Sequence, residues 1–352
     1  MGNDTIQDMP ILPVVRQPRG ASYFFGTWSG RILLLNTVIF VLMVLREPSA
    51  IFMPSMEFIR EFGSKSIPDI ARGEYWRFVT PMFVHIGLIH FFFNALGLYY
   101  IGYQIEHILG SKWFVGVFLV TGIIGNLSSC LFSLSLSAGA SGALFGLLGA
   151  GFKLEGLISE RFDQLGERIR PRKRIYSGMV VSNLILGLII PVIDNAAHIG
   201  GLISGWLLME ALLRSRPNRL RAKNPHIAWL VYLSLAVFSM IAVARTVDPV
   251  VVVKRYYEAA LSAETAPEAY HDFTEALRIR PLDGNVRLSR GKLLLQNGEV
   301  EAGITDIKIA ASSGKVSESD FRAVIDDLKL TGHFLEAELV RKLYQSGGGS
   351  GI

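Results

Sequence analysis

Apolar and polar positions alternate in long blocks over the first 248 residues of the chain. Seven apolar stretches of about 15 to 24 residues are separated by more polar segments, which range from a few residues to the long segment 46–80. Because a helix needs roughly 20 apolar residues to cross the hydrocarbon core of a bilayer, each stretch predicts a membrane-spanning helix. The predicted spans cover residues 31–45, 81–104, 113–133, 138–157, 175–192, 196–213 and 227–244.

The pattern changes after about residue 249. Charged residues with helical periodicity replace the apolar stretches, and Glu-Ala pairs recur at residues 268–269, 301–302 and 336–337. Gly298 and Gly332 shortly precede the second and third pairs, and the spacing matches the tetratricopeptide repeat, a stacked helix hairpin. The pattern therefore predicts a tetratricopeptide-like helical domain over 249–346, with a generic small helical domain as the alternative. Residues 347–352 are rich in glycine and serine, which predicts a disordered tail.

Composition agrees with a membrane protein that carries a soluble domain. Half of the residues are hydrophobic, and the formal net charge is only +5, so no nucleic-acid partner is predicted. The single cysteine, Cys130, excludes a disulfide within the chain and a multi-cysteine metal site. Residues 1–27 lack the apolar region of a cleavable signal and predict a flexible cytosolic tail. The predicted fold class is all-α: a polytopic transmembrane helix bundle with a C-terminal helical-repeat domain.

Basic residues set the predicted orientation of the spans. They gather after the fourth and sixth spans, at residues 161–174 and 214–223, and the positive-inside rule places both loops in the cytoplasm. The N-terminus then also lies in the cytoplasm. With seven spans, the basic loop and last span at residues 216–248 lead to a C-terminal domain outside the cytoplasm.

Five of the polar side chains inside the apolar stretches stand out as candidates for chemistry, because ionisable groups at membrane depth are costly and point to function. His85, His90 and Asn94 fall in the first half of the second span, Ser141 near the start of the fourth, and His198 near the start of the sixth. All three spans run from outside to inside in the predicted topology. The five side chains are therefore expected at one depth, in the outer leaflet.

Glycines predict how two of these spans approach each other. They form one stripe with His198, at Gly201 and Gly205, and a second beside Ser141, at Gly142, Gly146 and Gly149. Facing stripes let helix backbones approach closely and would bring Ser141 and His198 within hydrogen-bond reach. A serine beside a histidine is a nucleophile with its general base. The alternative is that the glycines are plain packing motifs. Phe145, one turn beyond Ser141, is expected to pack on the imidazole.

The second span supplies candidate donors for the oxyanion that acyl transfer develops. His90 and Asn94 are four residues apart, on one helix face, and both can donate; the Ser141 backbone N–H is a third candidate. His85 is five residues before His90, about 140° around a helix, so it is expected to face elsewhere in a structural role.

Asp194 lies four residues before His198 and raises the possibility of a triad. Together with Asn195 it stands where the sixth span begins, and both residue types are preferred helix N-caps. A dyad also buries less charge than a triad at this depth. The prediction is that Asp194 caps the helix and is not catalytic.

These residues together resemble the rhomboid family of intramembrane serine proteases. Five family patterns occur in order within residues 28–215. They are ExWR at Glu74, Trp76 and Arg77; HxxxxHxxxN at His85, His90 and Asn94; GxxxE at Gly102 and Glu106; GxSGxxxG at Gly139, Ser141, Gly142 and Gly146; and AHxxGxxxG at Ala197, His198, Gly201 and Gly205.

The resemblance implies a six-helix core with Ser141 as nucleophile and His198 as general base, and an oxyanion site from His90, Asn94 and the Ser141 amide. It implies single-span membrane-protein substrates, cut in or near the outer part of their transmembrane segment, and a reaction without metal or cofactor. The chain departs from the pattern at Phe145, where many relatives carry tyrosine, and in its seventh span and C-terminal domain.

Several functional expectations follow from these patterns. The C-terminal domain is expected to recruit a substrate or partner protein, and the host membrane is expected to be a bacterial plasma membrane. A catalytically silent rhomboid-like protein that binds and sorts transmembrane clients is the alternative, although such relatives usually lose Ser141 or His198. A solute transporter is a third possibility, but neither a broken-helix ion site nor repeat-related halves can be recognised.

Overall fold

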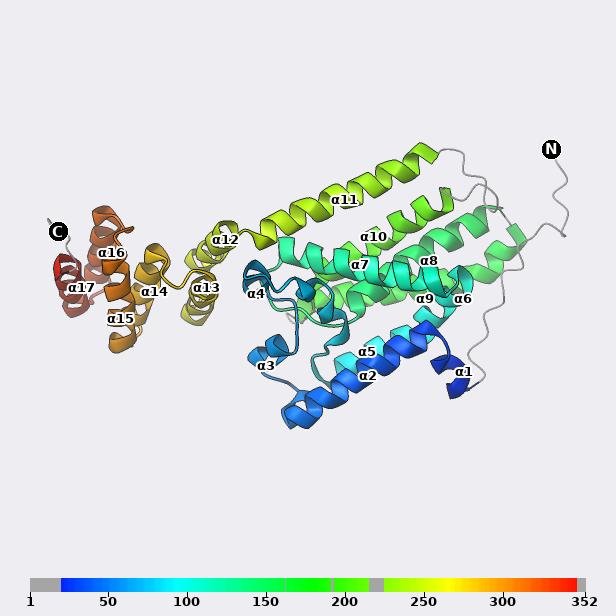
Figure 1. Cartoon of the computed structure of the whole chain (residues 1–352), viewed down its shortest axis with the longest axis horizontal. Helices are drawn as coiled ribbons and strands as arrows, with labels where there is room; N and C mark the ends of the chain where they lie inside the picture. The colour runs from blue at the N-terminus through cyan, green and yellow to red at the C-terminus, as the bar shows by residue number, and fades with distance from the viewer. Residues whose placement is uncertain (1–19, 162, 191–192, 215–224, 347–352) are drawn as a thin grey trace. The chain divides into compact units, whose positions relative to one another are not determined.

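The computed structural model describes residues 20–161, 163–190, 193–214 and 225–346 (Figure 1). Within these ranges the chain is helical, apart from loops and one isolated antiparallel bridge between Lys65 and Ser137. It divides into two compact units, and the first consists of residues Met1–Ser66 and Tyr75–Ala244. The second joins the segment Ile67–Glu74 to residues Arg245–Ile352.

The first unit contains the apolar helices. Its elements are α1 Ala21–Phe25, α2 Trp28–Arg46, η2 Pro48–Ile51, α3 Met56–Glu61, η3 Tyr75–Phe78, η4 Thr80–Phe83, α5 Gly87–Gly97, the π-helical turn η5 Leu98–Gly102, α6 Tyr103–Leu109, α7 Ser111–Phe132, α8 Ser141–Arg161, α9 Asp163–Ile189, α10 Asn195–Arg214 and α11 Pro225–Val247. Helix α8 lies between α7, α9 and α10 and packs against all three (Figure 1). Its apolar residues, including Ala143, Leu147 and Leu148, form a core with Phe114 and Phe118 of α7.

Four of the described helices are long and apolar enough to cross a membrane, by length and composition. They are Trp28–Arg46, Ser111–Phe132, Asn195–Leu213 and Leu230–Val247. Only 11% of the apolar window of Leu230–Val247 is buried inside the protein. Such a surface is stable in hydrocarbon and unfavourable in water, as expected for a lipid-facing span. The number of spans, seven, stays a prediction.

The helices of two predicted spans begin a few residues after the predicted edges. The second span was predicted to begin at residue 81, but its helix α5 begins only at Gly87. Pro81 lies in the separate 3₁₀ turn η4, and Gly87 has a φ of 80°, so the chain bends before the helix can propagate. The fourth span was predicted from residue 138, but α8 begins at Ser141 because Gly139, with a φ of 121°, interrupts the backbone.

Other predicted boundaries also shift. The predicted cytosolic tail 1–27 includes the short helix α1, and its residues 1–19 lie outside the described ranges. The backbone of the predicted basic loop at 161–174 is largely helical, since α9 already begins at Asp163. Residues 215–224 of the second basic loop and the tail 347–352 lie outside the described ranges as well.

The second unit contains the predicted helical repeats as successive helix pairs. Its elements after α4 Ile67–Ala71 are α12 Pro249–Ser262, α13 Ala266–Ile279, α14 Gly284–Gln296, α15 Val300–Ser312, α16 Glu318–Leu330 and α17 Phe334–Ser346. The three Glu-Ala pairs fall in the first turns of α13, α15 and α17, the second helix of each pair. Gly298 and Gly332, with φ of 81° and 88°, make the tight turns within the second and third pairs. The assignment to tetratricopeptide repeats stays a prediction.

The second unit also includes a segment from far earlier in the chain. Helix α4 packs on α12 and α13, and its Ile67 and Ile70 side chains are fully buried. Arg72, just after α4, donates to the Arg278 carbonyl oxygen at 3.5 Å. The predicted membrane core 28–215 therefore includes an eight-residue stretch that folds with the C-terminal helices, a long-range pairing for which the sequence pattern carries no signal.

Candidate active site

Ser141 and His198 are hydrogen-bonded to each other. His198 Nε2 lies 2.8 Å from Ser141 Oγ, although the residues are 57 positions apart. Ser141 is the first residue of α8 and His198 lies in the first turn of α10, so the two helices meet at their N-terminal ends. In this geometry the imidazole nitrogen can accept the hydroxyl proton and so activate the oxygen as a nucleophile.

Close contact between glycines and backbone atoms of α8 and α10 allows the short distance between Ser141 Oγ and His198 Nε2. A Cβ atom on Gly201 would lie 2.0 Å from the Gly142 carbonyl oxygen, and one on Gly205 would lie 1.9 Å from that of Gly146. Both distances are far inside van der Waals contact, so only glycine fits at either position. On the opposite side, a Cβ on Gly146 would lie 2.0 Å from Thr121 Oγ1 of α7. Helices α7, α8 and α10 are thus held at backbone-contact distance.

Phe145 fixes the plane of the imidazole. Its ring is stacked on that of His198, with centroids 4.2 Å apart and an interplanar angle of 5°. The stacking removes rotamer freedom from His198, which is otherwise buried. Among the described residues His198 Nδ1 has no hydrogen-bond partner. Within the described ranges, no carboxylate is hydrogen-bonded to this second nitrogen, so the geometry is that of a serine–histidine pair.

His90 presents a donor beside this dyad. Its Nδ1 accepts the Ile86 backbone N–H at 3.3 Å, so in the neutral ring the proton is on Nε2. The Nε2 and Cε1 atoms lie against Gly139, where a Cβ would be only 2.6 Å from either atom. Gly139 combines this close approach with a φ of 121°, and both features require glycine. The His90 N–H thus points at the loop that leads directly into Ser141.

Asn94 lies one turn further along α5. Its Nδ2 donates to the His90 carbonyl oxygen at 2.9 Å, which leaves its second N–H for another acceptor. Among the described residues its buried Oδ1 has no partner. The neighbouring face of α5, about 100° around the helix, exposes Ile89 and Phe93 by 75% and 65%. The polar face of this helix therefore points inward and the apolar face outward, as expected in lipid.

The prediction that His85 faces away from His90 is wrong. The two ring centroids lie 5.5 Å apart, and His85 makes an edge contact with Phe91 at the same distance. The error came from placing His85 on the helix, where five residues correspond to about 140°. His85 lies before Gly87, in extended chain that folds back against α5. It is fully buried and supports the His90 ring.

Asp194 stands at the N-cap of α10. Its Oδ1 accepts the Ala197 N–H at 3.0 Å and its carbonyl oxygen accepts the His198 N–H at 3.1 Å. Its Oδ2 accepts from the Ser129 hydroxyl. Asn195, predicted as a second cap, instead donates to the Leu184 carbonyl oxygen of α9 at 3.1 Å.

The remaining motif residues make contacts away from Ser141 and His198. Arg77 is buried and donates to the carbonyl oxygens of Arg60 and Ser64, while Trp76 is 56% exposed. Glu74 belongs to the second unit, where its N–H donates to the Asp69 carbonyl oxygen. These residues shape the loop between α2 and α5 and have no direct place in the dyad.

Glu106 connects the start of α2 to the junction between α6 and α7 through hydrogen bonds. Its carboxylate accepts the Trp28 and Ser29 N–H groups and both the Ser29 and Ser111 hydroxyls, at 2.8 to 2.9 Å. Burial raises the pKa of this carboxyl, but the four hydrogen bonds outweigh it and hold the pKa below its usual range. Glu106 is therefore ionised and stabilises the positive end of the α2 dipole.

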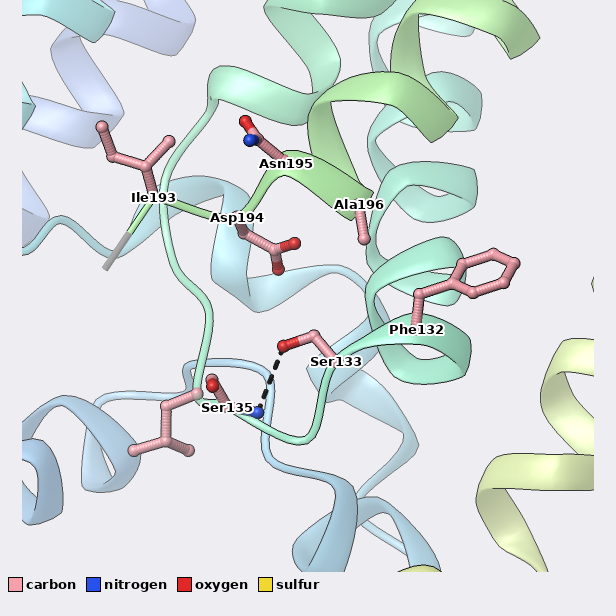
Figure 2. Close-up of a pocket in the computed structure, with 8 residues that line it drawn as sticks. Phe132, Ser133, Ser135, Ile193, Asp194, Asn195 and Ala196 are labelled. Atoms are coloured by element: carbon pink, nitrogen blue, oxygen red, sulfur yellow. Dashed lines mark hydrogen bonds between the residues drawn. The ribbon is translucent and has the colours of Figure 1, made fainter. Parts of the chain in front are cut away.

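A small cavity lies where α10 begins. It has a volume of about 200 Å³ and is lined by Phe132, Ser133, Ser135, Leu136, Ile193, Asp194, Asn195 and Ala196. Figure 2 shows the Asp194 side chain directed toward the loop that begins at Ser133. Neither this loop nor Lys65, which donates a hydrogen bond to the Ser133 carbonyl oxygen, could be recognised as part of the site beforehand, because neither carries a periodic pattern.

Comparison with known proteins places this site in a defined domain. Residues 72–215 match the Rhomboid domain. Rhomboid protease GluP of Bacillus subtilis (strain 168) is 36% identical over 186 residues, which cover 53% of this chain and 35% of that protein. RHOMBOID-like protein 4 of Arabidopsis thaliana is 32% identical over 224 residues, covering 60% and 49%.

A third relative extends the similarity to another group of organisms. Rhomboid-like protease 1 of Toxoplasma gondii is 30% identical over 196 residues, which cover 53% of this chain and 64% of that protein. The matched regions span from about a third to less than two thirds of the length of these relatives. Ser141, His198, His90 and Asn94 all lie inside the matched domain. With its apolar helices, the chain is an integral, multi-pass membrane protein.

Proposed function

We propose that this chain, whose residues 72–215 form a rhomboid domain, is an intramembrane serine protease. It hydrolyses peptide bonds in or near the transmembrane segment of membrane-protein substrates by a dyad of Ser141 and His198. The observation that carries the proposal is the 2.8 Å contact between His198 Nε2 and Ser141 Oγ at the starts of two packed apolar helices.

The chemistry follows from the positions of the donors and acceptors. Ser141 Oγ attacks the scissile carbonyl carbon while His198 Nε2 takes the hydroxyl proton. The negative charge that develops on the carbonyl oxygen is met by His90 Nε2–H, the free Asn94 N–H and the Ser141 amide. His198 then returns its proton to the leaving amine. Water, activated by the same nitrogen, hydrolyses the acyl-serine and restores the dyad.

The substrates are proposed to be single-span membrane proteins. A regular helix hides each carbonyl in a hydrogen bond to the N–H four residues on, so Ser141 can reach only a segment that has unwound. Small or helix-destabilising residues should therefore mark the cut site. Since Ser141 and His198 begin their helices, we place the cut in the outer part of the substrate's span.

The second unit is built from two chain segments far apart in the sequence, and this arrangement supports the proposed topology. Segments Ile67–Glu74 and Arg245–Ile352 fold together, so both must lie on one side of the membrane. The chain between them must then cross the bilayer an even number of times, and the second to seventh predicted spans meet this condition. The basic loops favour, by the positive-inside rule, a shared side outside the cytoplasm. There we propose that the helical pairs recruit a substrate or partner protein.

Cysteine labelling in intact bacterial cells tests this topology. In a Cys130→Ala background, Met53→Cys and Glu299→Cys should both react with a membrane-impermeant maleimide, because both lie outside. Lys112→Cys, at the start of α7, should react only after the cells are permeabilised. Labelling of residues 53 and 299 from opposite sides would contradict the even number of crossings.

A reconstituted cleavage assay tests the function itself. The full chain and a tagged single-span substrate are incorporated into vesicles, and the products are mapped by mass spectrometry. We expect one cut within the outer part of the span, abolished when a fluorophosphonate labels Ser141. Tight substrate binding without any product or label would instead favour the silent client-binding protein.

A further inference from the structure

Lys65 is an unusual residue in the first unit because it is a fully buried lysine. It lies in the loop after α3, and its Nζ donates to the Ser133 carbonyl oxygen at 3.3 Å. A buried ammonium is costly unless hydrogen bonds and an opposite charge compensate it. The groups that surround Lys65 therefore indicate what this lysine stabilises.

The main chain of Lys65 holds the loop that leads to the nucleophile. Its N–H donates to the Ser137 carbonyl oxygen at 2.8 Å, and its carbonyl oxygen accepts the Ser137 N–H at 3.3 Å. Ser137 is two residues before Gly139, which contacts His90, and four before Ser141. This two-bond bridge anchors the last turn of chain before α8 begins.

Asp194 is held in the same network. The Ser137 hydroxyl hydrogen-bonds to its carboxylate, as does that of Ser129. Burial raises the pKa of Asp194, but the charge of Lys65 and hydrogen bonds from Ser129, the Ala197 amide and Ser137 outweigh it and lower the pKa. The carboxylate is therefore ionised while it caps α10, the helix that carries His198.

We infer that Lys65 is a positioning residue for the dyad: its backbone anchors the loop before Ser141, its ammonium anchors the Ser133 carbonyl oxygen of the same loop, and its positive charge stabilises the Asp194 carboxylate that caps the helix of His198. Both catalytic side chains sit at the first turn of a helix, so the relative placement of the two helix starts sets their distance. This inference rests on the proposed protease function for its kinetic consequence, and on geometry alone for its structural one.

The kinetic test replaces Lys65 by methionine, which keeps the length and apolar stem but removes the charge. An error of about 1 Å in dyad geometry costs roughly 100-fold in rate, and a partial loosening should cost about 10-fold. We expect kcat to fall about 10-fold with KM within about twofold of wild type. The rate of fluorophosphonate labelling of Ser141, which needs no substrate, should fall by the same factor. Lys112→Met, a change at an exposed lysine, is the matched control and should match wild type.

A double variant distinguishes a positioning role of Lys65 from a general destabilisation of the fold. Lys65→Met removes the positive charge that stabilises the buried Asp194 carboxylate, whereas adding Asp194→Asn removes the negative charge as well and keeps a good N-cap. The double variant should therefore recover at least about threefold of the labelling rate lost in Lys65→Met. No recovery, or a labelling rate in Lys65→Met equal to wild type, would overturn the inference.

Hydrogen exchange gives a readout that is independent of activity. In Lys65→Met the amides of Ala197 and His198 should exchange about 10-fold faster than in wild type, because their acceptors on Asp194 are loosened. Amides in the middle of α7 should stay unchanged. Unchanged protection at Ala197 and His198 defeats the inference even if the chain cleaves substrates. Faster exchange in a chain that cleaves nothing supports the positioning role and counts against the protease function instead.

Discussion

Replacing Ser141 by alanine is expected to abolish cleavage, with a fall in kcat on the order of 10⁴- to 10⁶-fold. His198→Ala should lose as much, because the 2.8 Å contact makes the two side chains one functional unit. For the same reason the double variant should be no slower than either single variant. Single-turnover cleavage of a reconstituted single-span substrate measures all three.

Ser204→Ala is the matched control for these variants. Ser204 is also a buried serine in this helix bundle, but its hydroxyl donates to the Gly201 carbonyl oxygen of its own helix α10 at 2.9 Å. Its loss should leave kcat within about twofold of wild type. If His198→Ala kept more than about a tenth of the wild-type rate, His198 could not be the general base.

Gly205→Ala is expected to have the second largest effect, although the change adds only one methyl group. The new Cβ would lie 1.9 Å from the Gly146 carbonyl oxygen, so α8 and α10 must separate by about 1 Å or more. Overpacking of this kind costs about 1 to 3 kcal/mol of stability, and a dyad displaced by about 1 Å loses roughly 100-fold in rate. Thermal unfolding in detergent and kcat on the same substrate measure the two losses.

Gly116→Ala provides the comparison for that variant. Gly116 lies in α7, and a Cβ there meets nothing within 4 Å. The same change should therefore be neutral or stabilise the helix by up to about 1 kcal/mol, since alanine has the higher helix propensity. Equal activity of Gly205→Ala and Gly116→Ala would show that glycine contact does not set the dyad distance.

The apolar pattern located the helices more reliably than their ends. The apolar pattern predicts a helix at 113–133, and α7 spans Ser111–Phe132. The agreement is close because an uninterrupted apolar segment in a bilayer must satisfy all its backbone hydrogen bonds internally, which an α-helix does. The second span was placed too early, because the break at Pro81 and Gly87 depends on where the loop between α2 and α5 packs. His85 was misplaced for the same reason. Helical spacing applies only where a helix exists.

Some contacts of the candidate site could be predicted from the sequence and others could not. Ser141, His198 and the glycines between them share short motifs with strict spacing, so their partnership could be predicted. The Lys65–Ser137 bridge and the Asp194 contacts join loops separated by 57 residues or more and involve common residue types. Such contacts come from tertiary packing and leave no periodic trace in one sequence. The Asn195 contact with α9 could not be foreseen for the same reason.

The pairing of α4 with α12 and α13 has a consequence for how the protein is made. Ile67 and Ile70 are buried, and their helix α4 packs on α12 and α13, which the ribosome begins to produce about 180 residues later. At roughly 5 to 20 residues per second, synthesis leaves these two apolar side chains uncovered for roughly 10 to 30 s. On the proposed topology, the C-terminal unit can fold only after the last predicted span is inserted and α12 and α13 have crossed the membrane. Completion of this unit is therefore a late step of biogenesis, and chains truncated before α12 should carry an unfolded, protease-sensitive segment at Ile67–Glu74.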